Sequence, residues 1–347
     1  MKVFIPHKKD FNVYFDEIIA YSSHEFIFDN RDEYNTSFEI VNIHFPEAIF
    51  NWIPPTKEEL YQLKSDLISW KQHSKLVLLF NDSQTHYDSG NTFKPLFDLI
   101  NSNVDAVVHY GDYSIKKFKS RFPENCFHYK IKHPTYESLH KVKPEGFEKK
   151  FNFSFKDKYV VSALGNIRSK EEALLVLKLF KAIPIKDKIL IAPNMFNILQ
   201  KPKGIPYRFR KIYTLFAKLW YFYPLNEKRF FLRFNHISYE LMVDLVLKTS
   251  LIIIPRKTSL NSGVLFLGLT FNKPMLIPQI GNLTEVAKEF ELPTLKLEEA
   301  LSPQVNNIVN YYQSNNPYLN DNKKKAYHPK NVASSLDKLL NTIKDKC

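Results

Sequence analysis

The segment from Leu251 to Val286 constrains the fold more than any other part of the chain. It begins with a continuous apolar run, Leu251 to Ile254, which is typical of a parallel strand buried on both faces and which stops at Pro255. A polar loop then leads through Asn261-Ser262-Gly263 into an apolar helix of about two turns, and Met275 to Pro278 predict a second buried strand. The helix start exposes unpaired backbone N–H groups at the positive end of the helix dipole. The segment therefore predicts a βαβ unit with a candidate anion site, although an ordinary βαβ unit with a well-capped helix gives the same pattern.

The rest of the chain repeats this alternation between short apolar strands and helical stretches, which indicates α/β folding with parallel sheets. One series of strands runs from Val3 to Ile131 and a second begins at Lys158, with a charged, weakly periodic stretch from His140 to Lys158 between them. A chain of 347 residues is long enough for two domains, each with its own core. We therefore expect two successive α/β domains with a cleft between them, and ligands beyond the carboxyl ends of the strands.

The composition excludes several classes of protein. Only eight glycines occur, and the chain has neither a G-x-G-x-x-G nor a G-x-x-x-x-G-K-[ST] phosphate loop. Two cysteines, Cys126 and Cys347, are too few for a disulfide framework, which favours a reducing cytoplasm. No signal peptide and no run of roughly 18 apolar residues is present, so we expect no membrane span. The net charge of +13 favours an anionic partner: a nucleic acid, a membrane surface or a phosphorylated substrate.

A second loop that suits a phosphate opens the second half of the chain. The residues GNIRSK, from Gly165 to Lys170, follow a predicted strand and precede an amphipathic helix. Parallel strands would place this loop at the same sheet edge as Asn261-Ser262-Gly263, so Arg168 and Lys170 would face that helix start. A guanidinium and an ammonium beside a helix N-terminus match the two negative charges of a diphosphate. Either basic residue alone is commonly a solvated surface charge, so the prediction depends on the combination.

The order of these motifs resembles the donor-binding half of GT-B glycosyltransferases of the large retaining family 4 type. GNIRSKEEALLVLKLF and the stretch from His236 to Glu285 are similar to that family's Gly-x-x-Arg loop, its acidic helix before a D-v-v-v-l-P strand, and its N-S-G or E-x(7)-E loop before G-k-P. The resemblance implies two Rossmann-like domains facing a central cleft, with acceptor binding at 1–145, nucleotide-sugar binding at 146–330, and a C-terminal helix at 331–347 that crosses back to the first domain. It implies a set of donor-binding residues on the two loops: Gly165, Arg168, Lys170, Asn261, Ser262 and Gly263.

The first half agrees with the same family in outline. The similar elements are Ile43-His44-Phe45-Pro46-Glu47 for H-x-H-W-P-E, Asn81 to His86 for H-N-x-x-P-H, Asp105 to His109 for a-D-x-i-v-h, and His133-Pro134-Thr135-Tyr136 for p-H-p-x-Y. In the family these loops face the acceptor. The resemblance therefore implies two groups of residues, catalytic and acceptor-binding respectively: Glu47, His86 and Asp82, and then His44, Asn81 and His109. For His109 and His133, hydrogen bonds that close the strand ends are the alternative.

The donor half departs from the family pattern at three positions. With Lys273-Pro274 aligned to G-k-P, Ser259 and Leu267 stand where the two glutamates of E-x(7)-E fall, and Asn272 replaces the usual glycine. The second glutamate holds the ribose hydroxyls in the family, so the ribose partner here must differ. Glu285 is the candidate substitute.

Glycosyl transfer requires that a proton leave the acceptor hydroxyl and that the charge of the leaving diphosphate be neutralised. An inverting enzyme would use Glu47 or Asp82 as the base, whereas a retaining enzyme of the kind resembled would let the leaving phosphate accept the proton. The sequence leaves both open. The histidines that end or follow strands in the first half show no close pair at metal-ligand spacing. We therefore expect no metal, and no cofactor apart from the nucleoside-diphosphate sugar that serves as donor.

Residues 207–223 predict an amphipathic helix that is both basic and aromatic. One face is mainly basic and another is aromatic: Arg208, Lys211, Leu215 and Lys218 against Phe209, Tyr213, Phe216 and Trp220. Such a helix suits an anionic membrane surface with its aromatic rings at the headgroup level, although an aromatic face packed in a core gives the same pattern. It would fit an enzyme that acts on a polyprenyl-linked acceptor at the inner face of the cell membrane.

Three functions compete. The first is a metal-independent hexosyl- or related glycosyltransferase (EC 2.4 type) that moves a sugar from a nucleoside-diphosphate sugar to a glycan or lipid-linked acceptor in cell-surface polysaccharide biosynthesis. The second is a nucleic-acid-binding protein, but the basic residues are spread along the chain and no RNP-like strand or helix-turn-helix pattern occurs. The third is a catalytically silent glycosyltransferase-like subunit, since the two glutamates are missing. We favour the first, with no nucleic-acid partner, in the cytoplasm or peripheral on the membrane.

Overall fold

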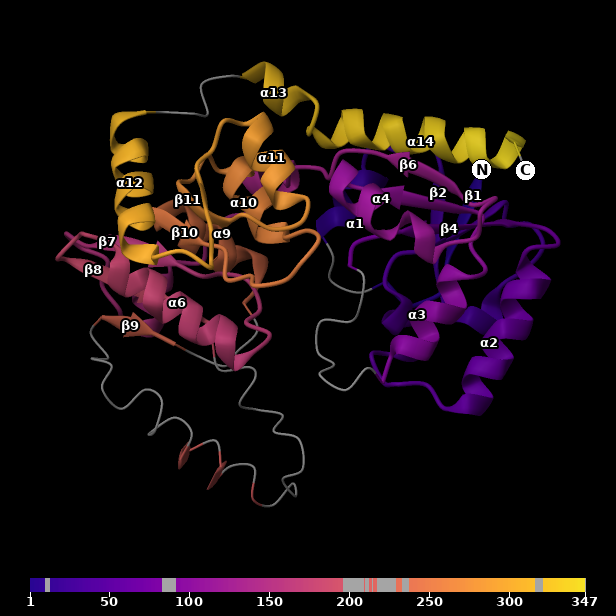
Figure 1. The fold of residues 1–347 in the computed structure, drawn as a ribbon, viewed down its shortest axis with the longest axis horizontal. Coiled ribbons are helices and arrows are strands. Elements are labelled where there is room, and N and C mark those ends of the chain that lie inside the picture. The colour runs from indigo at the N-terminus through magenta and orange to yellow at the C-terminus, as the bar shows by residue number, and fades with distance from the viewer. Residues whose placement is uncertain are drawn as a thin grey trace. The chain divides into compact units, whose positions relative to one another are not determined.

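The computed structural model describes residues 1–9, 13–82, 92–195, 209, 212–213, 215–216, 229–232, 237–315 and 321–346. Two compact units separate within it: Met1–Glu137 together with Asp321–Cys347, and Ser138–Asn320. In the described part of the chain each unit has a six-stranded sheet, and every strand pair in it is parallel (Figure 1). The α/β fold with two Rossmann-like domains is confirmed.

The sheet of the first unit has the strand order β2-β1-β3-β4-β5-β6. Its strands are β1 (Lys2–Ile5), β2 (Glu25–Phe28), β3 (Ile40–Ile43), β4 (Lys75–Leu79), β5 (Ala106–His109) and β6 (Phe127–Lys130). The central strands β3, β4 and β5 are buried on both faces, which explains why they are nearly continuous apolar runs. The helical segments are α1 (Val13–Ile19), η1 (Arg31–Glu33), η2 (Pro46–Phe50), α2 (Lys57–Trp70), α3 (Lys94–Asn101), α4 (Asp112–Phe118), η3 (Lys119–Arg121), α13 (Asp321–Lys325) and α14 (Pro329–Lys346).

Helix α14 belongs to the first unit although it ends the chain (Figure 1). Apolar residues along one side of it are buried in the core that surrounds β1 and α1. Its Asp337 accepts hydrogen bonds from the backbone N–H and the hydroxyl of Ser23, each at 2.7 Å. The prediction that a C-terminal helix returns to the first domain is therefore confirmed.

The sheet of the second unit has the strand order β12-β11-β10-β7-β8-β9. Its strands are β7 (Tyr159–Ser162), β8 (Lys188–Ile191), β9 (Phe230–Phe231), β10 (Leu251–Ile253), β11 (Met275–Pro278) and β12 (Thr294–Leu295). Its helices are α5 (Phe147–Phe151), α6 (Lys170–Ala182), α9 (Tyr239–Lys248), α10 (Gly263–Thr270), α11 (Leu283–Glu289) and α12 (Leu301–Ser314), and η4 (Glu137–Lys141) lies where the chain passes from one unit to the other.

Strands β7 and β10 are neighbours in this second sheet. Leu251 and Ile252 of β10 pair in parallel with Val161 and Ser162 of β7. The carboxyl ends of parallel neighbours lie at the same edge of a sheet, so the loops that follow β7 and β10 are adjacent. The expectation that the Gly165 loop and the Asn-Ser-Gly helix start share one sheet edge is confirmed.

Candidate functional site

The loop that follows β7 lies directly against the start of α10. A Cβ atom added to Gly165 would lie 2.7 Å from Val264 Cγ2 and 3.2 Å from Arg256 Nη2, both closer than ordinary van der Waals contact. Only glycine lets the loop approach α10 this closely without displacing one of those side chains. This contact brings the predicted Gly-x-x-Arg loop, the start of α10 and Arg256 together.

The start of α6 fixes the other end of the same loop. The Ser169 hydroxyl accepts the Glu172 N–H at 3.2 Å and so caps the helix. The Glu172 carboxylate turns back and accepts the Arg168 N–H at 2.7 Å, and the same oxygen pairs with Arg256 Nη1 at 3.1 Å. The buried Glu172 carboxylate therefore fixes the backbone that carries Arg168 and Lys170. The Arg168 side chain is half-buried, and that of Lys170 is exposed.

The start of α10 has an unusual cap. Ser262 is the N-cap residue, but its side chain makes no capping hydrogen bond. Ser262 is buried, and within the described residues its hydroxyl has no hydrogen-bond partner. An N-cap serine normally accepts an N–H of the first turn, which this one does not do. The hydroxyl and the first-turn N–H groups are therefore suited to a phosphate oxygen.

The loop after β10 is held in place by the loop after β11. Asn282 donates through its side chain to Asn261 Oδ1 at 3.0 Å and through its backbone N–H to Leu260 O at 2.9 Å. Gly281 has a φ of +50°, and a Cβ there would lie 2.3 Å from Ser259 O. The Asn261 side chain, predicted to bind the donor, is therefore engaged in shaping this loop.

The structure offers no carboxylate where the family pattern has its second glutamate. Leu267 occupies that position, and every residue of α10 from Val264 to Thr270 is buried. Glu285, the candidate substitute, lies in the first turn of α11, directly after the loop that contacts Asn261, and is half-buried. Its contact with a ribose stays a prediction.

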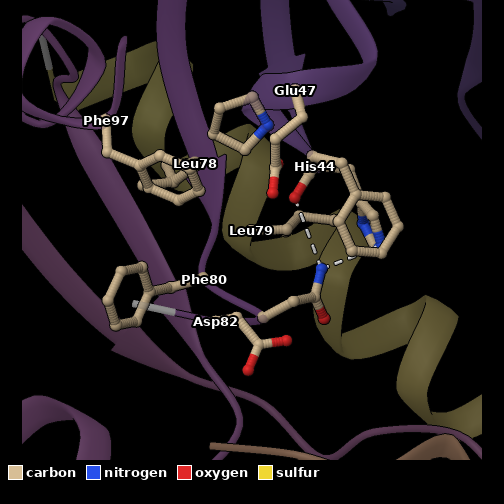
Figure 2. Close-up of a pocket in the computed structure, with 10 residues that line it drawn as sticks. His44, Glu47, Leu78, Leu79, Phe80, Asp82 and Phe97 are labelled. Carbon is tan, nitrogen blue, oxygen red and sulfur yellow. Dashed lines mark hydrogen bonds between the residues drawn. The ribbon is translucent and has the colours of Figure 1, made fainter. Parts of the chain in front are cut away.

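In the first unit, a pocket opens where β3 and β4 end side by side (Figure 2). The enclosed part of this pocket has room for about one water molecule. The lining residues follow those two strands or come from them and from α3: His44, Phe45, Pro46, Glu47, Leu78, Leu79, Phe80, Asn81, Asp82 and Phe97. Four of the predicted acceptor-side residues are thus brought together, with the carboxylates of Glu47 and Asp82 reaching the pocket from neighbouring strand ends.

The imidazole of this pocket is neutral. Asn81 Nδ2 donates to His44 Nε2 at 2.9 Å, so Nε2 is the acceptor and Nδ1 carries the proton. Burial, reinforced by the neighbouring His7 and His133, lowers the pKa of His44 well below its ordinary value, and burial lowers the pKa of His133 to about 4. Neutral imidazoles provide hydrogen bonds but no positive charge at pH 7. The pocket therefore suits a neutral hydroxyl group better than a phosphate.

His109 does not line this pocket. Its ring is fully buried, with Nδ1 3.1 Å from Ser114 Oγ and Nε2 3.0 Å from His128 Nδ1. Ser114 donates its own proton to Gly111 O, so it accepts from His109 Nδ1. Burial, and then the adjacent His128, lower the pKa of His109 to about 3. These hydrogen bonds close the end of β5, as the alternative prediction for His109 states. His86, predicted to be catalytic, lies outside the described residues.

One residue of the donor-side edge escaped the sequence analysis. Arg256 follows Pro255 at the end of β10, and the structure places its guanidinium between the Gly165 loop and Glu172. The available signal was a basic residue directly after a buried strand. Among the described residues, no group of three or more His, Cys, Asp or Glu side chains is arranged to hold a metal ion.

Comparisons with known proteins identify the architecture. No family model and no curated protein matches the sequence. Among solved structures, Anabaena HepE in complex with UDP and glucose is 11% identical over 99% of this chain and 100% of its own, with a TM-score of 0.65. Sucrose-phosphate synthase from Thermosynechococcus elongatus is 12% identical over 90% of this chain and 75% of its own, with a TM-score of 0.61. Trehalose 6-phosphate synthase from Burkholderia multivorans is 10% identical over 90% and 72%, with a TM-score of 0.57. At these identities the likeness establishes the fold, which is the two-domain, Rossmann-like GT-B fold.

Proposed function

We propose that this protein is a glycosyltransferase that moves a sugar from a nucleoside-diphosphate sugar to a glycan or lipid-linked acceptor in cell-surface polysaccharide biosynthesis. The observation that carries the proposal is the packing of the Gly165 loop against the start of α10, where the Ser262 side chain leaves the first turn uncapped. The HepE structures, obtained with UDP and with UDP-glucose, support a nucleotide sugar as the donor.

The donor diphosphate would bind at the sheet edge where β7 and β10 end. Arg168 would contact the phosphate oxygens through its planar guanidinium, and Lys170 would contribute a point charge. The backbone N–H groups of Gly263 and Val264 at the start of α10 would donate to the same anion, whereas the Leu265 N–H already donates to Ser262 O. Since these groups neutralise the leaving diphosphate, we propose a metal-independent hexosyl- or related transfer. Glu285 is our proposal for the ribose contact.

The acceptor hydroxyl would bind in the pocket of the first unit, beside His44 and the carboxylates of Glu47 and Asp82 (Figure 2). Asn81 lines the same pocket. If the reaction inverts the anomeric carbon, Glu47 or Asp82 takes the hydroxyl proton. If it retains, the leaving phosphate takes it and the carboxylates orient the acceptor. His86 is proposed as a further catalytic group.

A donor nucleotide should stabilise the folded protein. We expect at least one of the UDP-, GDP-, ADP- and CMP-sugars to raise the unfolding temperature, because a ligand that binds only the folded state stabilises it by mass action. Arg168→Ala should weaken that binding about tenfold or more, since it removes a charged hydrogen-bond donor. Thermal-shift assays and titration calorimetry measure both. If no nucleotide stabilises the protein and an RNA oligomer binds instead, the nucleic-acid-binding alternative is correct.

Leu267 favours a second candidate function, a catalytically silent glycosyltransferase-like subunit, because it removes the carboxylate of the family pattern. An active glycosyltransferase and a silent subunit would share this fold, and they would differ in whether the protein turns over the sugar nucleotide. Donor binding combined with slow hydrolysis or transfer of the sugar in the presence of polyprenyl-linked or glycan acceptors supports the enzyme.

We further propose that the protein binds the inner face of the cell membrane peripherally, through residues 207–223. Most of this stretch lies outside the described residues, but the side chains described in it are apolar and exposed: Phe209, Ile212, Tyr213, Leu215 and Phe216. Basic residues alternate with them in the sequence. Exposed aromatic side chains among basic ones suit an anionic lipid surface. No described helix has both the length and the apolar character needed to cross a bilayer.

Phe216→Ala combined with Trp220→Ala should lower binding to vesicles that contain anionic lipids several-fold, because the variant loses apolar area inserted at the headgroups. Flotation of vesicles with and without anionic lipid, at low and high salt, measures the effect. Phe127→Ala, which removes an equally aromatic side chain exposed on β6, is the matched control. Equal vesicle binding by all three proteins would rule out the stretch 207–223 as a membrane contact.

A further inference from the structure

A buried arginine lies beneath the proposed donor site. Arg256 lies in the loop that follows β10 and is only 4% exposed, as is its partner Glu172 on α6. A charge so removed from water requires compensation, and the carboxylate 3.1 Å away provides it. The pair joins the two loops that carry the predicted donor-binding residues, because one partner follows β10 and the other begins α6.

The orientation of the guanidinium places it between those loops. Its Nη1 donates to Glu172 Oε2 and, at 3.3 Å, to Pro255 O. Its Nη2 is the atom that lies 3.2 Å from where a Cβ of Gly165 would be, and Val264 of α10 borders the same position. The planar group therefore reaches from a carboxylate on one side to the Gly165 loop and the first turn of α10 on the other.

Stability alone is a poor explanation for this pair. A buried ion pair is rarely more stable than apolar side chains of the same volume, because desolvation of both charges offsets their attraction. The Glu172 carboxylate, moreover, also accepts the Arg168 N–H, so the pair is coupled to the backbone of the residue that we propose binds the diphosphate. The geometry thus connects Arg256 to Arg168 through a single carboxylate oxygen.

We infer that Arg256 is a positioning residue of the donor site, which holds the Gly165–Arg168 loop against α10 through Glu172 and so fixes the groups that recognise a nucleoside diphosphate. This inference rests on the proposed function. If Arg256 positions the phosphate-binding groups, its loss weakens the binding of UDP and leaves the binding of uridine unchanged. A purely structural role predicts no such difference. The loop that the pair holds carries the groups proposed to contact the phosphates and not the nucleoside. Because the pair is buried, salt screens it less than the exposed Lys170.

The test compares binding of UDP and of uridine by titration calorimetry at low and high salt. Glu172→Leu combined with Arg256→Met removes both charges at similar volume, a change that folded proteins tolerate. We expect this double variant to fold, to bind UDP about tenfold or more weakly at both salt concentrations, and to bind uridine as the wild type does. Arg229→Met, which removes an exposed arginine of the same unit, should change neither affinity.

Arg256→Lys provides a second measurement, which decides the question if the double variant does not fold. Lysine keeps the charge beside Glu172 but loses the planar fork that reaches Gly165, so UDP affinity should fall several-fold while the unfolding temperature stays close to that of the wild type. A folded variant of either kind that binds UDP as tightly as the wild type overturns the inference and leaves the proposed function intact. A wild-type protein that binds no nucleoside diphosphate overturns both.

Discussion

Glutamine in place of Glu47 should slow sugar transfer by roughly 10²- to 10⁴-fold, the usual contribution of a general base, while donor affinity stays unchanged. Glu47 lies in η2, which begins three residues after the end of β3, and is buried against the pocket that Asn81 and Asp82 also line. Glutamine preserves the shape and the polarity of the side chain but does not accept a proton. The loss should therefore appear in kcat for transfer to the acceptor, measured with saturating donor, and not in the binding of the nucleotide.

Asp82→Asn is the companion variant, because this second carboxylate reaches the same pocket from the end of β4 (Figure 2). If Glu47 is the base of an inverting reaction, Asp82→Asn should cost much less than Glu47→Gln; the opposite ranking assigns the base to Asp82. Glu39→Gln, which removes a half-buried carboxylate that is paired with Lys344 and does not line the pocket, is the control for a general loss of charge. Rates within about threefold of the wild type for both pocket variants would exclude a protein base and favour proton transfer to the leaving phosphate.

The fold could be predicted from the sequence because the strands of parallel sheets are buried on both faces. Such strands appear as short, nearly continuous apolar runs, and those expected between Val3 and Pro278 are all present. Strand β12 and helix α12, in the last part of the second unit, were not predicted. β12 has two residues, and α12 contains Pro303 and several asparagines, which disfavour helix. Pro303 is tolerated in the first turn, and the helix is stabilised instead by Val305 and Ile308, which are buried in the core with α6.

Only those parts of the site that follow from the order of the strands and loops, or from the family resemblance, could be predicted from the sequence. The order of strands and loops placed Gly165 and Ser262 at one sheet edge, and the family resemblance implied that Glu47 and Asn81 both lie on the acceptor side, without knowledge of any side-chain contact. Contacts between side chains that are distant in the sequence could not be predicted. The Glu172–Arg256 pair is one of these, since its members are 84 positions apart. The burial of His109 between Ser114 and His128 is another, because the sequence gives no sign that His128 would face it.

Alanine at Gly281 should both destabilise the second unit and weaken donor binding by more than tenfold. Gly281 has a φ of +50°, which costs a residue with a Cβ roughly 1–2 kcal/mol. The added Cβ would also lie 2.3 Å from Ser259 O and 2.8 Å from Leu260 O. Both are backbone atoms that no rotamer change can move, so the loop that leads to Ser262 must shift. We therefore expect a total loss of about 3 kcal/mol or more in the free energy of unfolding.

Gly146→Ala separates the two causes, because Gly146 has a φ of +80° in the same unit but no atom within 4 Å of its added Cβ. It should cost only about 1–2 kcal/mol of strain and leave UDP affinity as it is, since the residue precedes α5 and not the donor-side loops. Urea unfolding gives the stabilities, and titration of UDP at a temperature where both variants are folded gives the affinities. Equal destabilisation of the two variants with equal UDP affinity would mean that the contact between Gly281 and the Ser259–Leu260 backbone does not position the start of α10. A loss of UDP affinity in Gly281→Ala alone would locate the donor diphosphate at that helix start. The substitution neither adds nor removes a charge, so it acts only by displacing the loop that leads into α10.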